Sequence, residues 1–187
     1  MAEKRKTRAA DIEAAVRDVV TAIQQARIPY MLIGALALPV WGKPRATLDM
    51  DFMLLTPEIP GKLIDRLARL GFDLDAEWER RNPFLKDFQS RFRSERLALD
   101  ILLSKDAHHE AAFRRRLRKR YRAMNIWFPS AEDLILLKLR AGRPTDFDDV
   151  IGIIDRVGES LDLRYLSAWA RRLGIIEELN YVIDRTK

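Results

Sequence analysis

Three aspartates in two apolar strands place the strongest constraint on how this chain can fold. Asp49 and Asp51 lie in a strand predicted over residues 47–55, and Asp100 is the only charged residue in the run 97–103. Because side chains alternate along a strand, Asp49 and Asp51 point to the same face, with Cα atoms about 6–7 Å apart. Burying such carboxylates without a partner is costly or forces one of them to take up a proton. We therefore expect the two strands to lie side by side, so that the three acids meet.

A divalent cation would remove the repulsion between these acids. Mg²⁺ prefers hard oxygen ligands, and two metal ions about 3.5–4 Å apart can support an in-line phosphoryl displacement. We therefore interpret Asp49, Asp51 and Asp100 as candidate catalytic and metal-binding residues. The alternative is that the Asp49–Asp51 pair faces solvent or forms salt bridges with Lys43 and Arg45.

A strand–glycine–helix turn precedes the acids. The short apolar strand 30–33 ends at Gly34, and Ala35 begins a short helix that ends near residue 41. Free backbone N–H groups at the start of a helix favour phosphate, and glycine lets the backbone approach an anion closely. Lys43 and Arg45 lie between this turn and the acids. They are candidates for contacts with a triphosphate, or for pairing with the acids in the metal-free protein.

Lys138 lies in a helix predicted over residues 131–141 that is apolar on almost every side. A lysine is almost never fully buried without a partner, so we expect Lys138 to reach an acid or a phosphate. The alternative is a lysine that extends into solvent at the edge of the domain. Asp146 and Asp149 follow and are candidates for the same nucleotide site. Equally, they can be acids in the first turn of a helix, where the helix dipole favours negative charge, with Thr145 and Asp148 forming a capping box.

The remaining pattern predicts an α+β chain. We expect a basic frayed tail over residues 1–8, a sheet domain over residues 1–128 and a helical subdomain over residues 129–187. The predicted elements are helices over 11–27, 60–70 and 107–118, a hairpin of strands 89–93 and 97–103, a strand over 122–128, and helices over 131–141, 146–157, 163–173 and 175–184.

The positive charge of the chain favours a polyanionic binding partner. The formal net charge is +6, and seven of the nine residues 114–122 are lysine or arginine. Such a run can neutralise nucleic-acid phosphates. The candidate nucleic-acid-binding residues are Arg114, Arg115, Arg116, Arg118, Lys119 and Arg120. The alternative is a solvated helix face.

Several functional classes are excluded or disfavoured. The absence of cysteine excludes disulfides, thiolate zinc sites and a cysteine nucleophile. No apolar run approaches the roughly 18 residues of a membrane span, and the first residues lack the apolar stretch of a signal peptide, so we expect a cytoplasmic protein without a membrane partner. His108-His109-Glu110 lacks the i, i+4 histidine pair of zinc proteases and is interpreted as a helix start. We expect the four tryptophans to be core residues.

The segment Tyr30-Met-Leu-Ile-Gly-Ala-Leu-Ala-Leu-Pro-Val-Trp-Gly-Lys-Pro-Arg-Ala-Thr-Leu-Asp-Met-Asp resembles the signature of minimal nucleotidyltransferases. In particular it is similar to AbiEii-type nucleotidyltransferase-like proteins, some of which are toxins of toxin–antitoxin systems. The resemblance implies a polymerase-β-like mixed sheet with flanking helices and a C-terminal helical subdomain. It also implies that the Gly34-Ala35 turn binds a triphosphate and that Asp49, Asp51 and Asp100 hold Mg²⁺.

The stretch from Pro129 to Val150 resembles later motifs of the same family, in which a helix lysine and a following aspartate complete the site. The resemblance assigns these roles to Lys138 and to either Asp146 or Asp149. One departure is Ala35, where the family has serine or glycine. Alanine removes a possible hydroxyl contact with phosphate and leaves the backbone N–H contacts.

These observations predict a Mg²⁺-dependent enzyme that moves a nucleoside monophosphate from a nucleoside triphosphate to an acceptor hydroxyl, with two metal ions present during turnover. The expected acceptor is RNA, in particular the 3′ end of tRNA, and a protein hydroxyl is the main enzymatic alternative. The resemblance also implies a cognate antitoxin or toxin protein as a partner. One rival is a weakly active or inactive binding partner of the antitoxin kind. Another is a basic nucleic-acid-binding protein in which the three acids have no catalytic role.

Overall fold

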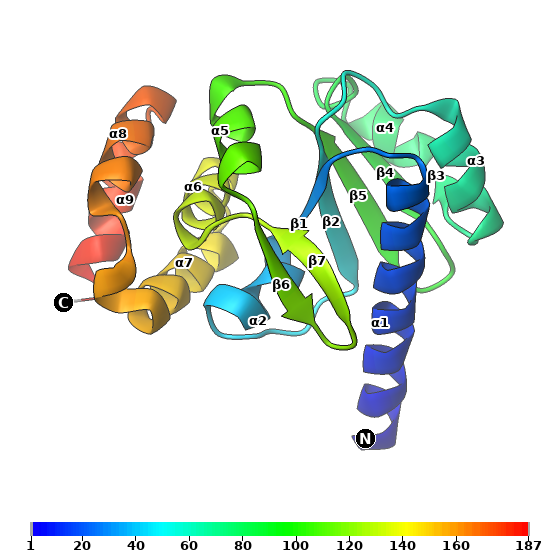
Figure 1. Ribbon diagram of the computed structural model, residues 1–187, viewed down its shortest axis with the longest axis horizontal. Helices are drawn as coiled ribbons and strands as arrows, with labels where there is room; N and C mark the ends of the chain where they lie inside the picture. The colour runs from blue at the N-terminus through cyan, green and yellow to red at the C-terminus, as the bar shows by residue number, and fades with distance from the viewer. Residues whose placement is uncertain (1, 187) are drawn as a thin grey trace.

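A mixed five-stranded sheet forms the centre of the molecule (Figure 1). The computed structural model describes residues 2–186, with side chains described from residue 12 onward. The strand order is β1-β2-β5-β4-β3, and a separate two-stranded sheet is formed by β6 and β7. The bounds are β1 Tyr30–Ile33, β2 Asp49–Leu54, β3 Asp73–Leu74, β4 Gln89–Arg93, β5 Ala98–Leu103, β6 Leu117–Tyr121 and β7 Met124–Phe128. The predicted α+β fold class is confirmed.

The pairing of β2 with β5 brings the acidic strands together. These two strands are parallel and set Asp51 opposite Asp100, whereas β1 pairs with β2, and β4 with β5, in the antiparallel direction. The predicted hairpin of residues 89–93 and 97–103 is therefore present. Its short turn at residues 94–97 fixes the register, with Arg91 opposite Asp100.

The two faces of the sheet bury different side chains. On one face, Phe52 and Leu99 belong to the main core cluster, together with Val19 of α1 (Ala2–Gln25) and Leu67 of α3 (Gly61–Arg69). Figure 1 shows α1 and α3 together on this side of the sheet. Helix α1 starts at Ala2, so residues 2–8 of the expected frayed tail are helical backbone instead, and Met1 lies outside the described residues.

The acids lie on the opposite face. Met53 packs with Phe113 of α5 (Ala107–Arg115) in a second, smaller core cluster. Because side chains alternate along β2, Asp49 and Asp51 share the face of Met53. The acids and the main core therefore occupy different sides of one strand.

Two predicted elements differ from the structure around the basic run. Helix α5 ends at Arg115, and β6 with β7 forms a hairpin whose turn places Arg122 in a left-handed conformation (φ +54°). Tyr121 and Ile126 of this hairpin are buried in the main cluster, and this tertiary burial overrides the helical continuation predicted to residue 118. Two other elements were not predicted, namely β3 and the short helix α4 (Ala76–Arg81).

Four longer helices gather at the C-terminal end (Figure 1). Their bounds are α6 Ala131–Ala141, α7 Pro144–Val157, α8 Leu163–Leu173 and α9 Ile176–Asp184, all within two residues of the predictions. Leu134 of α6 belongs to the same core cluster as the sheet and α1. The division into a sheet domain and a helical subdomain at residue 129 stays a prediction. In the described part of the chain, no helix has both the length and the apolar character needed to cross a membrane.

The start of α7 corrects one prediction. Pro144 occupies the first turn and Arg143 is the N-cap residue, whose side chain accepts no hydrogen bond from a backbone N–H of the helix. Proline suits this position because its missing N–H would have no partner there. Thr145 is therefore inside the first turn, and the capping box predicted for Thr145 and Asp148 is wrong. Helix α6, by contrast, has a side-chain cap, since the Asp133 N–H donates to Ser130 Oγ at 3.2 Å.

Candidate active site

The structure brings Asp49, Asp51 and Asp100 onto one face of β2 and β5. Asp49 is the exposed first residue of β2, Asp51 is partly exposed, and Asp100 is buried. Asp51 and Asp100 are register partners, and Asp49 lies two residues before Asp51 on the same strand. Among residues 12–186, nothing hydrogen bonds to the carboxylate of Asp49 or of Asp51. The three acids, called the acid trio below, form a group in which only Asp100 has a cationic partner.

That partner is Arg91, which the sequence analysis did not identify. Its Nε donates to Asp100 Oδ1 at 2.7 Å and its Nη2 to Asp100 Oδ2 at 2.5 Å. The signal was present in the sequence, because a hairpin with strands 89–93 and 97–103 and a short turn sets residue 91 across from residue 100. Opposite charges that face each other across two strands are a common cross-strand pair.

Charge repulsion and burial act together on Asp51. Burial, followed by the charges of Asp100 and Asp49, raises the pKa of Asp51 to about 7, although the charges of Arg143 and Lys138 act to lower it. The ionised acid trio is therefore short of positive charge. A set of carboxylate oxygens with such a deficit suits a hard divalent cation. The donor set thus fits the Mg²⁺ expected from the sequence.

Gly34 lies directly against Asp51. Its φ is +65°, and a Cβ atom added there would lie 2.0 Å from Asp51 Oδ2. Only glycine allows the turn after β1 to approach this carboxylate. The next residue, Ala35, belongs to a four-residue 3₁₀ helix (Gly34–Ala37), and its side chain is buried in the main cluster. Its backbone N–H is thus the group that Ala35 can offer to a phosphate.

Lys138 is buried and has two acidic partners. Its side chain is 4% exposed, and its Nζ donates to Asp149 Oδ2 at 2.7 Å and to Asp146 Oδ1 at 3.2 Å. Arg143 binds Asp146 at 2.6 Å, and Arg45 binds both oxygens of Asp149 at 3.0–3.1 Å. Burial would raise the pKa of Asp146, but the hydrogen bonds and charges of Arg143 and Lys138 outweigh burial and lower it. The alternative of a lysine extending into solvent is wrong, and Lys138 is the centre of a buried charge network.

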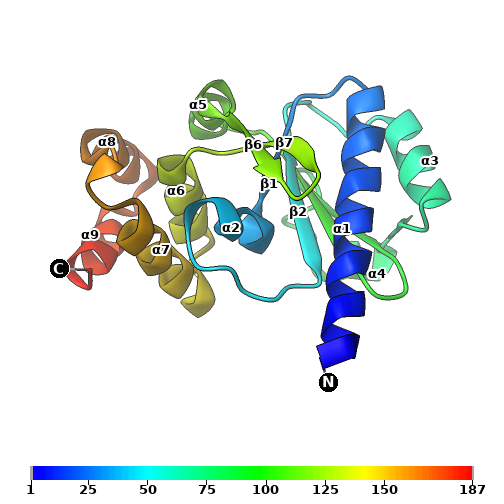
Figure 2. The ribbon, with the colours of Figure 1, turned by 60° about the horizontal axis from the view of Figure 1, so that its bottom comes forward.

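The loop that leads into β2 is held by α7. The Nη1 of Arg156 donates to Gly42 O at 2.8 Å, and Lys43 Nζ lies 3.1 Å from Asp155 Oδ2. With the Arg45–Asp149 pair, three contacts join this loop to α7. Figure 2 shows the loop passing from α2 (Leu38–Trp41) by α7 to the start of β2. The salt bridges of Lys43 and Arg45 are thus with acids of α7, and the alternative in which they neutralise Asp49 and Asp51 is not what the structure shows.

The basic run is divided between two elements. Arg115 is paired with Glu132 at 3.0 Å and Asp133 at 3.3 Å, and its guanidinium lies 3.9 Å from the ring centroid of Tyr165. Arg114 lies 3.9 Å from Glu110, and Arg116 stacks on Trp127. The remaining candidates on β6 are exposed, namely Arg118, Lys119 and Arg120. The run therefore does not form one continuous helix face.

A second group of potential metal ligands lies at the start of α5. One ligand atom from each of Asp106, His108 and His109 lies within 4.8 Å of the others. Arg140 already donates to Asp106 Oδ2 at 2.8 Å and lies 3.1 Å from His109 Nε2. Asp106 also caps the helix, because it accepts from the His109 N–H at 2.9 Å. The interpretation of this segment as a helix start is confirmed, and a guanidinium already serves as the cation of the group.

His109 leads to a prediction about acid stability. Burial lowers the pKa of His109 to about 4, although the charge of Asp106 raises it. Because the unfolded histidine titrates near 6.5, the native state binds fewer protons between pH 6.5 and 4, and stability is lost as pH falls through this range. We expect a loss of up to about 3 kcal/mol across this window, which His109→Gln removes. Urea denaturation at pH 7 and pH 4.5 tests this, and equal losses in both proteins would contradict it.

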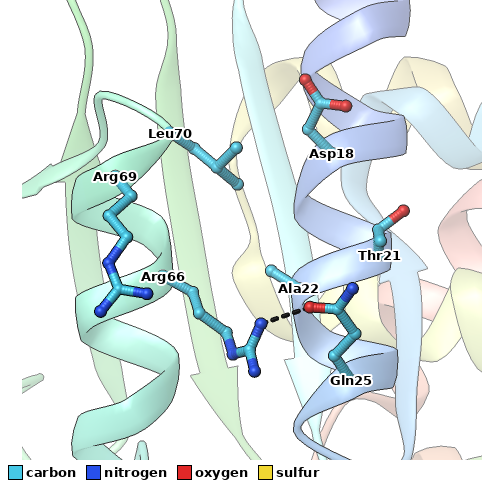
Figure 3. A pocket seen from close by; sticks show the side chains of 7 residues that line it. All are labelled: Asp18, Thr21, Ala22, Gln25, Arg66, Arg69 and Leu70. Atoms are coloured by element: carbon cyan, nitrogen blue, oxygen red, sulfur yellow. Dashed lines mark hydrogen bonds between the residues drawn. The ribbon is translucent and has the colours of Figure 1, made fainter.

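A shallow pocket lies away from the acid trio, between α1 and α3 (Figure 3). Arg66 of α3 donates to Gln25 of α1 across it. Its lining residues are Asp18, Thr21, Ala22, Gln25, Arg66, Arg69 and Leu70. Since α1 and α3 pack on the face of the sheet opposite the acids, this pocket is not part of the candidate active site.

The sequence matches no protein-family model and no curated protein, whereas solved structures share the fold. The solution structure of the antibiotic-resistance factor ANT(2'')-Ia superposes with a TM-score of 0.62 at 16% identity, covering 89% of this chain and 95% of that one. The lincosamide antibiotic adenylyltransferase LnuA gives 0.55 at 17% identity, covering 75% and 95%. An antigenic nucleotidyltransferase-like protein from Paracoccidioides brasiliensis gives 0.51 at 15% identity, covering 90% and 91%. At these identities the likeness shows the fold, and the chain has the nucleotidyltransferase fold.

Proposed function

We propose that this protein transfers a nucleoside monophosphate from a nucleoside triphosphate to an acceptor hydroxyl, with release of pyrophosphate, in a Mg²⁺-dependent reaction. The observation that carries the proposal is the convergence of Asp49, Asp51 and Asp100 on one face of two neighbouring strands, directly beside Gly34. Bringing three carboxylates together, one of them buried, is unfavourable without a cation. The nucleotidyltransferase fold of the chain supports the same chemistry.

Each acid has a defined role in this proposal. Asp49 and Asp51 would hold two metal ions, and Asp100 would hold one of them and help to remove the proton from the acceptor hydroxyl. The bound ions would neutralise the phosphate charge that develops during displacement. The Gly34 and Ala35 N–H groups face the triphosphate.

The buried charge network supplies cations beside the acid trio. Arg45 and Arg143 are 38% and 66% exposed, whereas Lys138 is enclosed by Asp146 and Asp149. We infer that Lys138 fixes the two acids, and that these acids in turn hold Arg45 and Arg143 where a triphosphate can reach them. Lys43, which is exposed, is a further candidate for phosphate contact.

RNA, in particular the 3′ end of tRNA, is our first candidate for the acceptor. The net charge of +6 and the exposed Arg118, Lys119 and Arg120 on β6 support it. A small hydroxylated antibiotic is the second candidate, because LnuA is described with lincomycin bound and ANT(2'')-Ia in complex with adenylyl-2''-tobramycin. A protein hydroxyl is a third possible acceptor.

We further propose a role in a toxin–antitoxin pair, with a cognate antitoxin or toxin protein as partner. The alternative is a weakly active or inactive antitoxin-like partner, in which Ala35 marks the lost activity. Controlled expression of the wild-type protein and of Asp49→Ala separates the two. An enzyme toxin arrests growth only with Asp49 intact, whereas a binding partner acts equally well without it.

Transfer is tested directly with labelled nucleotides. The purified protein is incubated with each labelled nucleoside triphosphate and Mg²⁺, together with total tRNA or a panel of aminoglycosides and lincosamides. We expect label on one acceptor class, and a decrease of about 1000-fold or more in Asp49→Ala and Asp51→Ala, because the metal supplies several kcal/mol of transition-state stabilisation. Label on the protein itself would identify a protein hydroxyl as the acceptor. No transfer with any nucleotide and acceptor would contradict the enzymatic proposal.

A further inference from the structure

Arg91 pairs with Asp100 through both carboxylate oxygens, which is more than the single contact of an ordinary surface ion pair. Two nitrogens of its guanidinium bind the two carboxylate oxygens, and the side chain is only 23% exposed. Two-point pairing of a guanidinium with a carboxylate is among the stronger polar interactions in proteins. The antiparallel register of β4 and β5 places Arg91 directly across from Asp100, so the backbone itself fixes this pair.

Trp78 of α4 provides the other contact of this guanidinium. The guanidinium carbon of Arg91 lies 5.5 Å from the centroid of the Trp78 ring, a distance typical of a cation–π pair. Trp78 was predicted to be a core residue, but within the described part of the chain it belongs to neither core cluster. Its ring lies beside Arg91 and gives the guanidinium a contact that does not depend on Asp100.

We propose that Arg91 is a latch on Asp100 that competes with a divalent cation and thereby sets the metal affinity of the acid trio. This inference rests on the proposed function, because it takes the acid trio as the metal site. While Arg91 binds both oxygens, Asp100 can join a metal site only if the guanidinium gives up at least one of them. The guanidinium then keeps its contact with Trp78. Arg91 is thus a positioning residue, which acts through Asp100.

The test measures metal binding in the absence of nucleotide. Mn²⁺ is titrated into the metal-free protein and the free ion is followed by electron paramagnetic resonance. Arg91→Gln removes the charge and the two-point pairing, whereas Arg91→Lys keeps the charge and loses the two-point geometry. We expect both variants to bind Mn²⁺ more tightly, by about tenfold or more for Arg91→Gln, because a hydrogen bond to a charged group no longer has to be broken.

Arg93→Gln is the matched control. Arg93 lies two residues further along β4, on the same face, and pairs with Asp75 rather than with the acid trio. Its replacement removes the same charge and leaves the Arg91–Asp100 pair intact. We expect an increase in Mn²⁺ affinity of no more than about fivefold, which is the size of an exposed charge effect. Thermal denaturation of every variant verifies that it is folded.

The outcomes separate the latch from the proposed function. If the two Arg91 variants bind Mn²⁺ no more tightly than Arg93→Gln, the latch is wrong even though the acid trio binds metal. If the Asp100→Asn variant binds Mn²⁺ as tightly as the wild-type protein does, the proposed metal site is wrong, and the latch is wrong with it. Tighter binding in both Arg91 variants, together with weaker binding in Asp100→Asn, supports the proposal.

Discussion

Replacing Asp51 by asparagine is expected to raise the free energy of unfolding of the metal-free protein by about 2–4 kcal/mol at pH 8. Burial, with the charges of Asp100 and Asp49, raises the pKa of Asp51 from 3.8 to about 7. The native carboxyl therefore binds its proton more tightly than the unfolded one. Stability is lost as pH rises from about 4 through 7, and the whole cost is present above pH 7. Asparagine has nearly the same shape and no charge, so it avoids this cost.

The pH dependence distinguishes this explanation from a general effect of the substitution. Urea denaturation in the presence of a chelator, at pH 4.5 and at pH 8, gives the stability difference between Asp51→Asn and the wild-type protein. With a pKa of 3.8 in the unfolded chain and about 7 in the native one, the difference at pH 4.5 should be only about a quarter of the difference at pH 8. Asp49→Asn is the control, because Asp49 lies on the same strand and face but is exposed. An equal difference at both pH values, or a loss of stability at pH 8, would contradict the assignment.

The same substitution should have the opposite effect on function. Mg²⁺ should stabilise the wild-type protein and leave Asp51→Asn nearly unchanged, since the ion binds the native acids and not the unfolded chain. Nucleotidyl transfer should fall by about 1000-fold or more in the variant. Residues that destabilise the metal-free protein and are required for the reaction are typical of active sites.

The sequence was sufficient to predict the arrangement of the acids. Side-chain alternation fixed the common face of Asp49 and Asp51, and a single acid in an apolar strand required Asp100 to lie near them. Burial reasoning also predicted that Lys138 has a partner. In each case one physical constraint, the free-energy cost of an unpaired buried charge, allowed only a few arrangements of the side chains.

The remaining features depend on tertiary contacts that a local pattern does not contain. The basic run was predicted as helix because nothing in its own residues shows that Tyr121 would be buried by a hairpin. Trp78 was assigned to the core, whereas its ring lies beside Arg91, a residue that the pairing of β4 with β5 places across from Asp100. The start of α7 is different, because Pro144 is a local signal for the first helical turn, whereas the helix was predicted to begin two residues later, at Asp146.

Lys138→Met is expected to lower the free energy of unfolding by about 3 kcal/mol or more, because it leaves Asp146 and Asp149 buried with less compensating charge. Asp146 is fully buried and Asp149 is 8% exposed. Arg143 and Arg45 still bind these acids, so the effect should lie near the lower end of the range for breaking a buried ion pair.

The control for Lys138→Met is Lys43→Met, which removes a lysine from an exposed pair with Asp155. Such a pair contributes at most about 1 kcal/mol, so urea denaturation should separate the two variants clearly. Adding Asp149→Asn to Lys138→Met should recover part of the lost stability, because it removes the charge left without its lysine. Recovery would show that Lys138 acts mainly by neutralising acids. Two results would contradict this: an equal loss of stability in Lys138→Met and Lys43→Met, or a further loss in the double variant. Either would mean that the buried network contributes through packing. Lys138 would then not fix the acids that hold Arg45 and Arg143 beside the acid trio.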